Sequence, residues 1–541
     1  MEKKWWHDKI VYQIYPKSFM DADNDGIGDI KGIISRLDYL KDLGVDILWL
    51  TPFFPSPMVD NGYDVQDYTG VNPLFGTMED VDTLIAELKK RDMDLMIDIV
   101  ANHTSDRHPW FLESKKSKDS PYHDYYIWRD RPTNDHQSCF GGSAWQYDEE
   151  AGQYYFHEFA VGQPDLNWEN PKILEEITAA INFWMEKGVR GIRFDVIHLI
   201  GKEIDRDIYG YGPTLHEKVH ALNRNSFGKY DAVTVGEAWG DLDKAIDFTL
   251  PSREELNMVF QFEVTDYTSD WSSKDKHGKF TPRPMDMKVA RDIWTKYQLG
   301  LNGKSWNALF IENHDLVRAV NKFGDPLRYP LESAKEIATL YFFLKGTPFI
   351  YQGQELGMTN IRIDRVEDYD DVEIKGNYRD LVLRDKVLTE REFLEACNKE
   401  GRDNNRTPMQ WNAQVNAGFN KGAKPWFFVN PNYPSINAEK EAKDPDSVLS
   451  YYKRMIALRK SKEYSDVFVY GDFRPIDVKN DNLFVYERKW NDKAVYVIVN
   501  MGGKEESLDL PFSVGKVLLH NYQERIVSAL RPYEALVVEG D

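Results

Sequence analysis

The sequence predicts a (β/α)8 or TIM barrel with an inserted loop-rich domain after its third strand and a C-terminal antiparallel β domain. Three observations lead to this prediction. Eight short apolar runs recur along the chain, amphipathic segments separate several of them, and hairpin patterns replace this alternation near the C-terminus. Near-continuous apolar strands alternating with helices are typical of a parallel sheet that is buried on both faces. A doubly wound sheet is the alternative, because strand number alone does not exclude it.

The strands and helices of the barrel are expected in a regular order. The eight apolar runs are Val11–Tyr15, Asp46–Leu50, Leu95–Val100, Gly191–Val196, Val233–Trp239, Val259–Val264, Ala308–Ile311 and Pro348–Tyr351. Between them, Ile33–Leu43, Val81–Leu88 and Ile173–Met185 carry apolar residues at three- and four-residue spacing, which predicts amphipathic helices. This succession of strand and helix is the basis for the predicted barrel.

Two segments interrupt the alternation. Residues 103–170 are rich in Tyr, Trp, His and Asp and are interpreted as an inserted loop-rich domain. Residues of about 360–430 lack a clear alternation of strand and helix and are interpreted as a loop-rich excursion of the barrel. The barrel is therefore predicted to comprise residues 1–102 and 171–460.

The C-terminal segment, residues 461–541, is predicted to be a small antiparallel β domain. A helix at Val448–Leu458 precedes it. The runs Leu483–Glu487 and Ala494–Asn500 are joined by the turn Trp490–Lys493, and Val517–Leu519 and Ala535–Val538 follow.

The composition excludes several classes of partner. The chain of 541 residues has a net charge of −21, which argues against nucleic acid or an anionic membrane as the main partner. No apolar run reaches the roughly 18 residues of a membrane span, and the N-terminal segment lacks the apolar core of a signal peptide. The two cysteines, Cys139 and Cys397, are expected to be free thiols in a reducing compartment. We therefore expect a cytoplasmic protein.

Acidic residues lie where the predicted strands end. Catalytic residues of such barrels lie at the C-terminal ends of the strands. Here Asp98 ends the third strand, Asp195 the fourth and Glu237 the fifth, and His314 and Asp315 follow the seventh. Each acid alone is better explained by a structural ion pair, but acids at four strand ends together favour a catalytic site.

Two of these acids suit different chemical roles. Arg193 and Asp195 lie two residues apart and share one face of a strand, so the guanidinium should keep the carboxylate ionised, as a nucleophile requires. Glu237 lies in the segment GEAW, where apolar surroundings and nearby carboxylates should raise its pKa, as a general acid requires. Hydrolysis of glycosides with retention uses such a pair.

The segments DIVANH, GIRFDVIH, VGEAW and ENHD resemble the four signature regions of the alpha-amylase family, glycoside hydrolase family 13, in order and spacing. The resemblance extends from VYQIYPKSF near the N-terminus to the last β domain. It implies that Asp195 is the nucleophile, Glu237 the acid/base and Asp315 the transition-state stabiliser. It further implies that Arg193, His103 and His314 position the same sugar and that Asp98 supports the site.

Within the family, the segments DNGYD, QPDLN and GRDNNRTPMQW are similar to the oligo-1,6-glucosidase subgroup, and above all to its dextran glucosidases. This resemblance implies an exo-acting enzyme that cleaves α-1,6 bonds from the non-reducing ends of isomaltooligosaccharides and dextran. Asp60 and Arg402 would hold the terminal glucose, and Tyr63 would stack on it. Val196, directly after the nucleophile, would favour α-1,6 bonds, and Trp239 would line the next subsite.

One position departs from the family pattern, and three other functions compete. In QGQEL, Gln354 stands where the family usually has Glu, which puts a secondary charge interaction in doubt. A trehalose-6-phosphate hydrolase would share the acids but needs basic groups for phosphate, which the net charge does not favour. A non-catalytic binding subunit is disfavoured because all three acids are present, and a sucrose isomerase because no basic, aromatic-rich loop stands out.

An acidic loop near the N-terminus predicts a calcium site. Asp21, Asp23, Asp25 and Asp29 occupy positions 1, 3, 5 and 9 of the loop, and Ile27 at position 7 can offer its backbone carbonyl. Position 12 is glycine, so the loop is not a complete EF-hand, and a solvated acidic turn is the alternative. Because the resembling glucosidases carry Ca²⁺ in the matching loop, we expect one structural Ca²⁺ and no organic cofactor. The expected partner is a small neutral oligosaccharide, without nucleic acid or membrane, and the expected state is a monomer.

Overall fold

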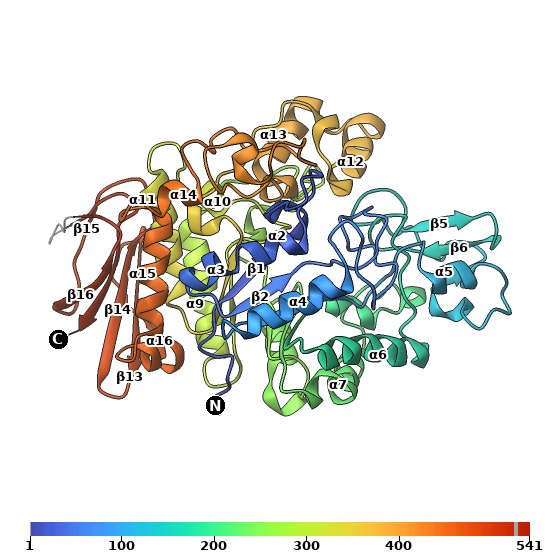
Figure 1. Cartoon of the computed structure of the whole chain (residues 1–541), viewed down its shortest axis with the longest axis horizontal. Helices are drawn as coiled ribbons and strands as arrows, with labels where there is room; N and C mark the ends of the chain where they lie inside the picture. Colours follow the sequence, from blue (N-terminus) through green and yellow to red (C-terminus); the bar gives the residue numbers. More distant parts are fainter. Residues whose placement is uncertain (1, 524–528, 541) are drawn as a thin grey trace.

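The structure, a computed structural model, describes residues 2–523 and 529–540, and its core is a barrel of parallel strands (Figure 1). Within this part of the chain the barrel strands are β1 (Val11–Ile14), β2 (Ile47–Leu50), β3 (Asp94–Val100), β7 (Gly191–Asp195), β8 (Val233–Glu237), β9 (Met258–Phe260), β10 (Ala308–Leu309) and β11 (Thr347–Tyr351). Their order is β10-β11-β1-β2-β3-β7-β8-β9, and each hydrogen-bonded pair in this order is parallel. Since β9 also packs beside β10, the sheet closes on itself and the predicted barrel is confirmed.

All eight predicted strands are found, but the fifth and seventh end two residues before their predicted limits, and the sixth ends four residues early. The run Val259–Val264 was expected to be one strand, but β9 ends at Phe260. After this point the carbonyl of Phe262 accepts hydrogen bonds from the Asp266 amide and the Thr265 hydroxyl, so the backbone turns. Phe262 and Val264 are nevertheless buried, which explains why an apolar run longer than the strand stands in the sequence.

The helices around the barrel begin and end at local signals. The segment expected to be one helix, Ile33–Leu43, forms α2 (Ile30–Ser35) and α3 (Leu37–Leu43), which are separated by a non-helical Arg36. A capping box at Thr77 starts α4 (Met78–Lys89), and Asn170 caps α6 (Pro171–Lys187). Further helices are α1 (Pro16–Phe19), α7 (Leu215–Asn225), α8 (Leu242–Thr249), α9 (Met287–Leu301), α10 (Ala319–Lys322), α11 (Pro330–Phe342), α14 (Ala438–Glu441), α15 (Val448–Lys460) and α16 (Ser465–Tyr470).

The segment between β3 and β7 contains a small sheet of its own. Its strands are β4 (Trp128–Arg129), β5 (Trp145–Asp148) and β6 (Gln153–Phe156), in the order β4-β6-β5, and the short helix α5 (Pro109–Ser114) precedes them. Figure 1 shows this sheet at the opposite end of the molecule from the C-terminal strands, with the barrel between them.

The excursion at about 360–430 is more helical than the sequence suggested. It contains α12 (Val372–Tyr378) and α13 (Glu390–Glu400), packed around a buried apolar cluster that includes Ile374 and Phe393. A capping box starts α13 at Thr389, and this signal is present in the sequence as Thr389 followed three residues later by a glutamate. These helices matter for function because the excursion also carries Arg402.

The C-terminal strands form an antiparallel sheet in the order β12-β13-β14-β18-β16. Its members are β12 (Asp472–Pro475), β13 (Leu483–Trp490), β14 (Lys493–Asn500), β16 (Val514–His520) and β18 (Ala535–Gly540), beside the pair β15 (Glu506–Ser507) and β17 (Ala529–Leu530). The hairpin between β13 and β14 turns at Asn491, which has a positive φ of 52°. The predicted range 461–541 includes residues 524–528 and 541, which lie outside the described residues.

Two further expectations concern the whole chain. Across the described residues, no helix is both long and apolar enough to cross a membrane. Cys139 is exposed and Cys397 is buried, and both are free thiols.

Candidate active site

Arg193 is the centre of a buried cluster of carboxylates at the ends of three neighbouring strands. The register of β3 and β7 places Asp98 opposite Arg193, and β8 follows on the other side of β7. Arg193 Nη1 donates hydrogen bonds of 2.8 Å to Asp98 Oδ1 and to Asp195 Oδ1, and Nη2 donates to Glu237 Oε2. One planar guanidinium therefore holds the carboxyl groups of Asp195 and Glu237 side by side.

The electrostatics of Asp195 differ from the expectation. Burial raises the pKa of Asp195 well above its ordinary value, and the charges of Glu237, Asp98 and Asp315 reinforce this rise, while Arg193 opposes it. The guanidinium was expected to keep Asp195 ionised, but its effect on the pKa is outweighed by burial and by the other acids, two of which share Arg193. Burial also raises the pKa of Asp98. Burial and the neighbouring carboxylates thus favour the protonated form of Asp195 more than in an exposed aspartate.

Glu237 has polar partners in addition to the apolar surroundings expected from GEAW. Its Oε1 accepts a hydrogen bond of 3.0 Å from the indole Nε1 of Trp239, and its Oε2 accepts one from Arg193. Glu237 is 5% exposed, whereas Trp239 is 46% exposed. Trp239 thus connects the buried acid to the solvent side of the site, and its ring lies 6.0 Å from that of Phe262.

Asp315 lies in a second, positively charged part of the site. Its Oδ1 accepts hydrogen bonds from Arg402 Nη1 at 3.1 Å and from Arg406 Nη2 at 2.9 Å, and its Oδ2 lies 3.0 Å from His314 Nε2. Burial alone would raise the pKa of Asp315, but His314, Arg402 and Arg406 hold it well below its usual value. Asp315 is therefore ionised and adds a negative charge near Asp195.

Arg402 connects this part of the site to the barrel loops. Its Nη2 donates to Asp60 Oδ1 at 3.3 Å, and its Nε and Nη2 form a two-pronged pair with Asp371. Its Nε also lies 3.2 Å from Glu373 Oε2. The Arg402 side chain is only 8% exposed, so its charge is neutralised by carboxylates rather than by water.

Asp60 is linked to His103 through the side-chain amide of Gln163. Gln163 Nε2 lies 3.1 Å from Asp60 Oδ2 and 3.2 Å from His103 Nε2. Burial lowers the pKa of His103 to about 4, so its imidazole is neutral at pH 7 and serves as a hydrogen-bonding group.

Tyr63 contacts both Asp98 and His314 in the site. Its hydroxyl donates a 3.0 Å hydrogen bond to Asp98 Oδ2, and its ring stacks on His314 with centroids 5.1 Å apart and planes 3° from parallel. Gln13 Nε2 lies 2.8 Å from Nδ1 of the same histidine and fixes the orientation of its ring. The structure thus brings Tyr63, His314 and Asp98 together with the catalytic acids.

Val196 occupies an unusual backbone position directly after Asp195. Its φ is 32° and its ψ is 45°, a left-handed conformation that is costly for a β-branched residue. It lies between the end of β7 and the short helical turn Ile197–Gly201, so the chain bends sharply after the predicted nucleophile. Val196 is buried, with 5% of its surface exposed.

Several residues of the site were not among those predicted from the sequence. Asp371, Glu373 and Arg406 contact Arg402 or Asp315, and Lys202 contacts Asp165 at 3.0 Å. Arg406 and Asp165 lie inside the segments GRDNNRTPMQW and QPDLN, so these motifs could have identified them. Asp371, Glu373 and Lys202 lie outside every such motif, and only the fold brings them to the site.

Gln354, the departure from the family pattern, lies outside this cluster. Its side-chain amide donates to the hydroxyls of Tyr341 at 2.8 Å and Tyr452 at 2.9 Å, and its oxygen accepts from the Tyr351 amide. None of these partners belongs to the catalytic cluster, so the change affects the packing between the barrel and α15.

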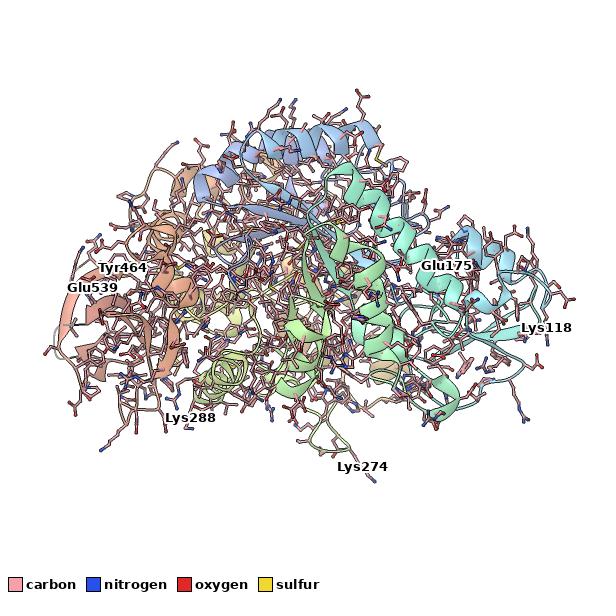
Figure 2. All side chains as sticks on the ribbon, turned by 90° about the horizontal axis from the view of Figure 1, so that it is seen from below. Lys118, Glu175, Lys274, Lys288, Tyr464 and Glu539 are labelled. Atoms are coloured by element: carbon pink, nitrogen blue, oxygen red, sulfur yellow. The ribbon has the colours of Figure 1, made fainter. Side chains whose placement is uncertain are left out.

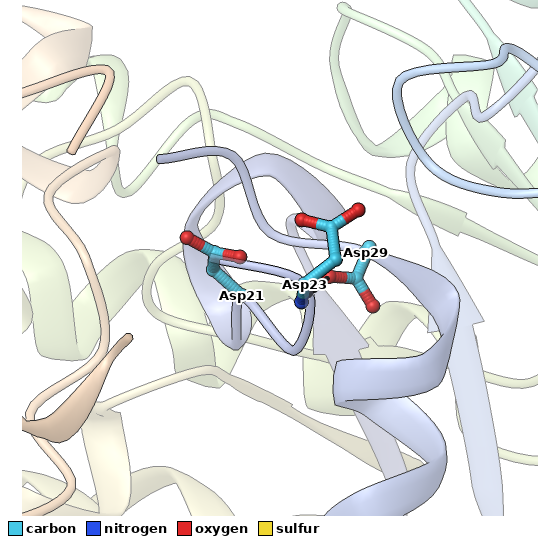
Figure 3. A group of neighbouring side chains, drawn as sticks. All are labelled: Asp21, Asp23 and Asp29. Carbon is cyan, nitrogen blue, oxygen red and sulfur yellow. Dashed lines mark hydrogen bonds between the residues drawn. The ribbon is translucent and has the colours of Figure 1, made fainter. Parts of the chain in front are cut away.

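The acidic loop gathers three of its four aspartates. Carboxylate oxygens of Asp21, Asp23 and Asp29 lie within 4.8 Å of one another (Figure 3), whereas Asp25 is outside this group. Burial, and then the charges of Asp25 and Asp29, raise the pKa of Asp23. Hard oxygen ligands that repel one another in this way fit a divalent cation such as Ca²⁺.

Comparisons with known proteins find one matching family and relatives that cover the whole chain. Residues 13–471 match the family described as alpha amylase, catalytic domain. The chain is 45% identical to an oligo-1,6-glucosidase of Heyndrickxia coagulans, with 99% of each chain covered. It is 44% identical to a glucan 1,6-alpha-glucosidase of Streptococcus pneumoniae, with 100% of each chain covered. The crystal structure of isomaltulose synthase SmuA from Protaminobacter rubrum superposes with a TM-score of 0.96 at 41% identity, again with 100% of each chain covered.

Proposed function

The chain belongs to the alpha-amylase family, and we propose that it is a retaining alpha-glucosidase that hydrolyses α-1,6-glucosidic bonds. Its substrates are isomaltooligosaccharides and dextran, from whose non-reducing ends it releases glucose. Membership of the family makes the protein a glycoside hydrolase. Full-length similarity to proteins named oligo-1,6-glucosidase and glucan 1,6-alpha-glucosidase supports the α-1,6 bond as the one cleaved.

The chemistry follows from the pair of acids on Arg193. In the first step a carboxylate oxygen of Asp195 attacks the anomeric carbon while Glu237 donates its proton to the departing glycosidic oxygen. In the second step Glu237 takes a proton from water, which attacks the glucosyl–Asp195 ester and releases Asp195. Retention requires carboxyl groups about 5–5.5 Å apart. The shared guanidinium supports this arrangement, because each acid accepts a hydrogen bond from one of its two terminal nitrogens.

The raised pKa of Asp195 works against its ionisation, which the role of nucleophile requires. The two steps need one proton on the Asp195–Glu237 pair when substrate is bound. In the proposed mechanism Asp195 must be ionised to attack, and Glu237 must carry the proton that it donates to the leaving oxygen.

Action at the chain end rests on one observation, the bridge that Arg402 makes between Asp60 and Asp315. The same guanidinium is bound to both carboxylates and to Asp371. A charged, nearly buried bridge of this kind would bind the hydroxyl groups of a terminal glucose and would obstruct a further sugar behind it.

The alternative, hydrolysis of trehalose-6-phosphate, has less support from the site. The arginines that touch the catalytic acids, Arg193, Arg402 and Arg406, are each bound to carboxylates. A phosphate would have to displace these partners or find cations elsewhere. A small neutral oligosaccharide has no such requirement.

We also propose that the acidic loop binds one structural Ca²⁺. Asp21, Asp23 and Asp29 would supply carboxylate ligands, and their mutual repulsion would be relieved by the ion. The ion would tie the loop before α2 to the barrel and would take no part in the bond cleavage. Action as a monomer in the cytoplasm remains a proposal that rests on composition.

The mechanism and the direction of attack are tested together with isomaltotriose labelled at its reducing end. The proposal predicts release of unlabelled glucose and labelled isomaltose, and proton NMR should detect α-glucose before mutarotation. Initial release of β-glucose would contradict retention. Initial release of labelled glucose would contradict action at the non-reducing end.

A further inference from the structure

The loop after β9 is attached to the active site at both ends. At its start, the Phe262 ring lies 6.0 Å from the ring of Trp239, the partner of Glu237. At its return, Lys279 Nζ lies 2.5 Å from Glu373 Oε2, and the same carboxylate lies 3.2 Å from Arg402 Nε. The loop follows the C-terminal end of a barrel strand, so it belongs to the face of the barrel that carries the catalytic acids.

The tip of this loop is a short hairpin that presents Trp271. Asp270 and Gly278 exchange two backbone hydrogen bonds, of 3.1 Å and 3.0 Å. The indole lies against Gly278 so closely that a Cβ at this glycine would be 2.2 Å from Cζ2 of Trp271. One part of the ring is thus held by the hairpin backbone, while Trp271 as a whole remains 73% exposed. Figure 2 shows the loop, marked by Lys274, projecting from the body of the molecule.

A single exposed apolar residue is common on protein surfaces, so exposure alone carries no conclusion. Here three further properties coincide. The ring belongs to the loop whose first residues pack beside Trp239, it lies against Gly278, where any side chain would displace it, and the next residue, Lys279, contacts Glu373. A fixed aromatic ring beside a sugar site is suited to stack on the apolar C–H face of a pyranose.

We propose that Trp271 is an outer sugar-binding platform, which stacks on a glucosyl unit beyond the cleaved bond, on the reducing-end side of longer α-1,6-glucan chains. This inference rests on the proposed function. In the proposed function Asp60 and Arg402 would enclose the terminal glucose, so the rest of the chain would leave the site past Trp239. The loop after β9 packs beside Trp239 through Phe262 and so lies next to this path. Trp271 therefore favours longer substrates and contributes nothing to cleavage of the disaccharide.

The test compares kcat/KM for isomaltose and isomaltohexaose in the wild type, Trp271→Ala and Trp271→Phe. In Trp271→Ala we expect the ratio of isomaltohexaose to isomaltose to fall about three- to tenfold, the effect of one aromatic stacking contact. The value for isomaltose should stay within about twofold of the wild type, and Trp271→Phe should recover most of the ratio. Tyr147→Ala, which removes another exposed aromatic residue, on β5, is the matched control and should leave the ratio unchanged.

Two results would overturn the inference. An unchanged ratio in Trp271→Ala would show that no distal sugar stacks there, and an equal loss on both substrates would assign Trp271 a purely structural role in the loop. A wild-type enzyme that is inactive on both sugars would instead refute the proposed function, and with it this inference. Normal wild-type activity with an unchanged ratio refutes the platform alone.

Discussion

Replacement of Arg402 by lysine tests the bridge that defines the chain-end subsite. Lysine keeps the positive charge but replaces a planar fork of five donors by a single ammonium group. Arg402 binds Asp371 through two nitrogens, Asp60 at 3.3 Å and Asp315 at 3.1 Å. An ammonium group at one point can retain about two of these hydrogen bonds.

The expected size of the effect follows from the hydrogen bonds that lysine cannot form. Two charge-assisted hydrogen bonds at about 1.5 kcal/mol each give about 3 kcal/mol, which corresponds to a decrease in kcat/KM of roughly 150-fold. The assay is the initial rate of glucose release from isomaltotriose, per mole of folded enzyme. Arg365→Lys is the control, because Arg365 forms only exposed ion pairs, and its activity should not change.

An Arg402→Lys enzyme within about threefold of the wild type in kcat/KM would refute this role of the bridge. A merely structural role would lower the folded fraction or Tm while leaving kcat/KM per folded molecule intact. Circular dichroism and a thermal melt of the same preparation separate these two results.

The remaining predictions concern the acids, a buried carboxyl group and the metal. Asp195→Asn should lower kcat by about 10³-fold or more with an unchanged Tm, and near-normal turnover would remove the nucleophile assignment. Glu237→Gln should lose about 10²–10⁴-fold on isomaltose but much less on an aryl glucoside with a good leaving group, and equal losses would contradict its acid role. Glu336 on α11 is fully buried with no hydrogen-bond partner for either carboxylate oxygen among the described residues, and burial raises its pKa well above 4.5. The folded state then binds this proton more tightly than the unfolded chain does, so stability should fall as the pH rises above about 4.5. Glu336→Gln should therefore raise Tm by a few degrees at pH 8 and much less at pH 5, and an equal effect at both would contradict the buried neutral acid. Chelation should lower Tm by several degrees, since a ligand at 100 times its Kd stabilises by about 2.7 kcal/mol, and Asp23→Asn should abolish that response; a wild-type Tm indifferent to chelator would refute the Ca²⁺ site.

The barrel and the ends of its strands could be predicted from the sequence because strands that are buried on both faces consist of nearly continuous apolar residues. Asp98, Asp195 and Glu237 interrupt or end such runs, which made them visible as candidates. The limits of a run are less informative. After Phe260 the apolar residues continue although the strand ends, because Phe262 and Val264 are buried from a turn.

The residues that set the charge balance and the pKa values of the site could not be predicted in the same way. Asp371 and Glu373 reach Arg402 from α12 and the residue before it, some thirty positions earlier in the chain, and only the packing of the excursion brings them together. The pKa of Asp195 was expected to be low from its neighbour Arg193, but it is raised, because the sequence does not show that Arg193 is shared with two other buried acids. Local spacing identifies a pair of residues, whereas charge balance depends on all the groups that the fold buries around them.

The most direct test of the proposed function is a side-by-side measurement of kcat/KM on isomaltose, isomaltotriose, maltose and trehalose-6-phosphate. We expect the highest values on the isomaltose series, with maltose and trehalose-6-phosphate far below them. A clear preference for trehalose-6-phosphate would leave the barrel and its acids in place but would contradict the proposed substrate. It would also require a phosphate-binding group that the carboxylate-bound arginines of this site do not supply.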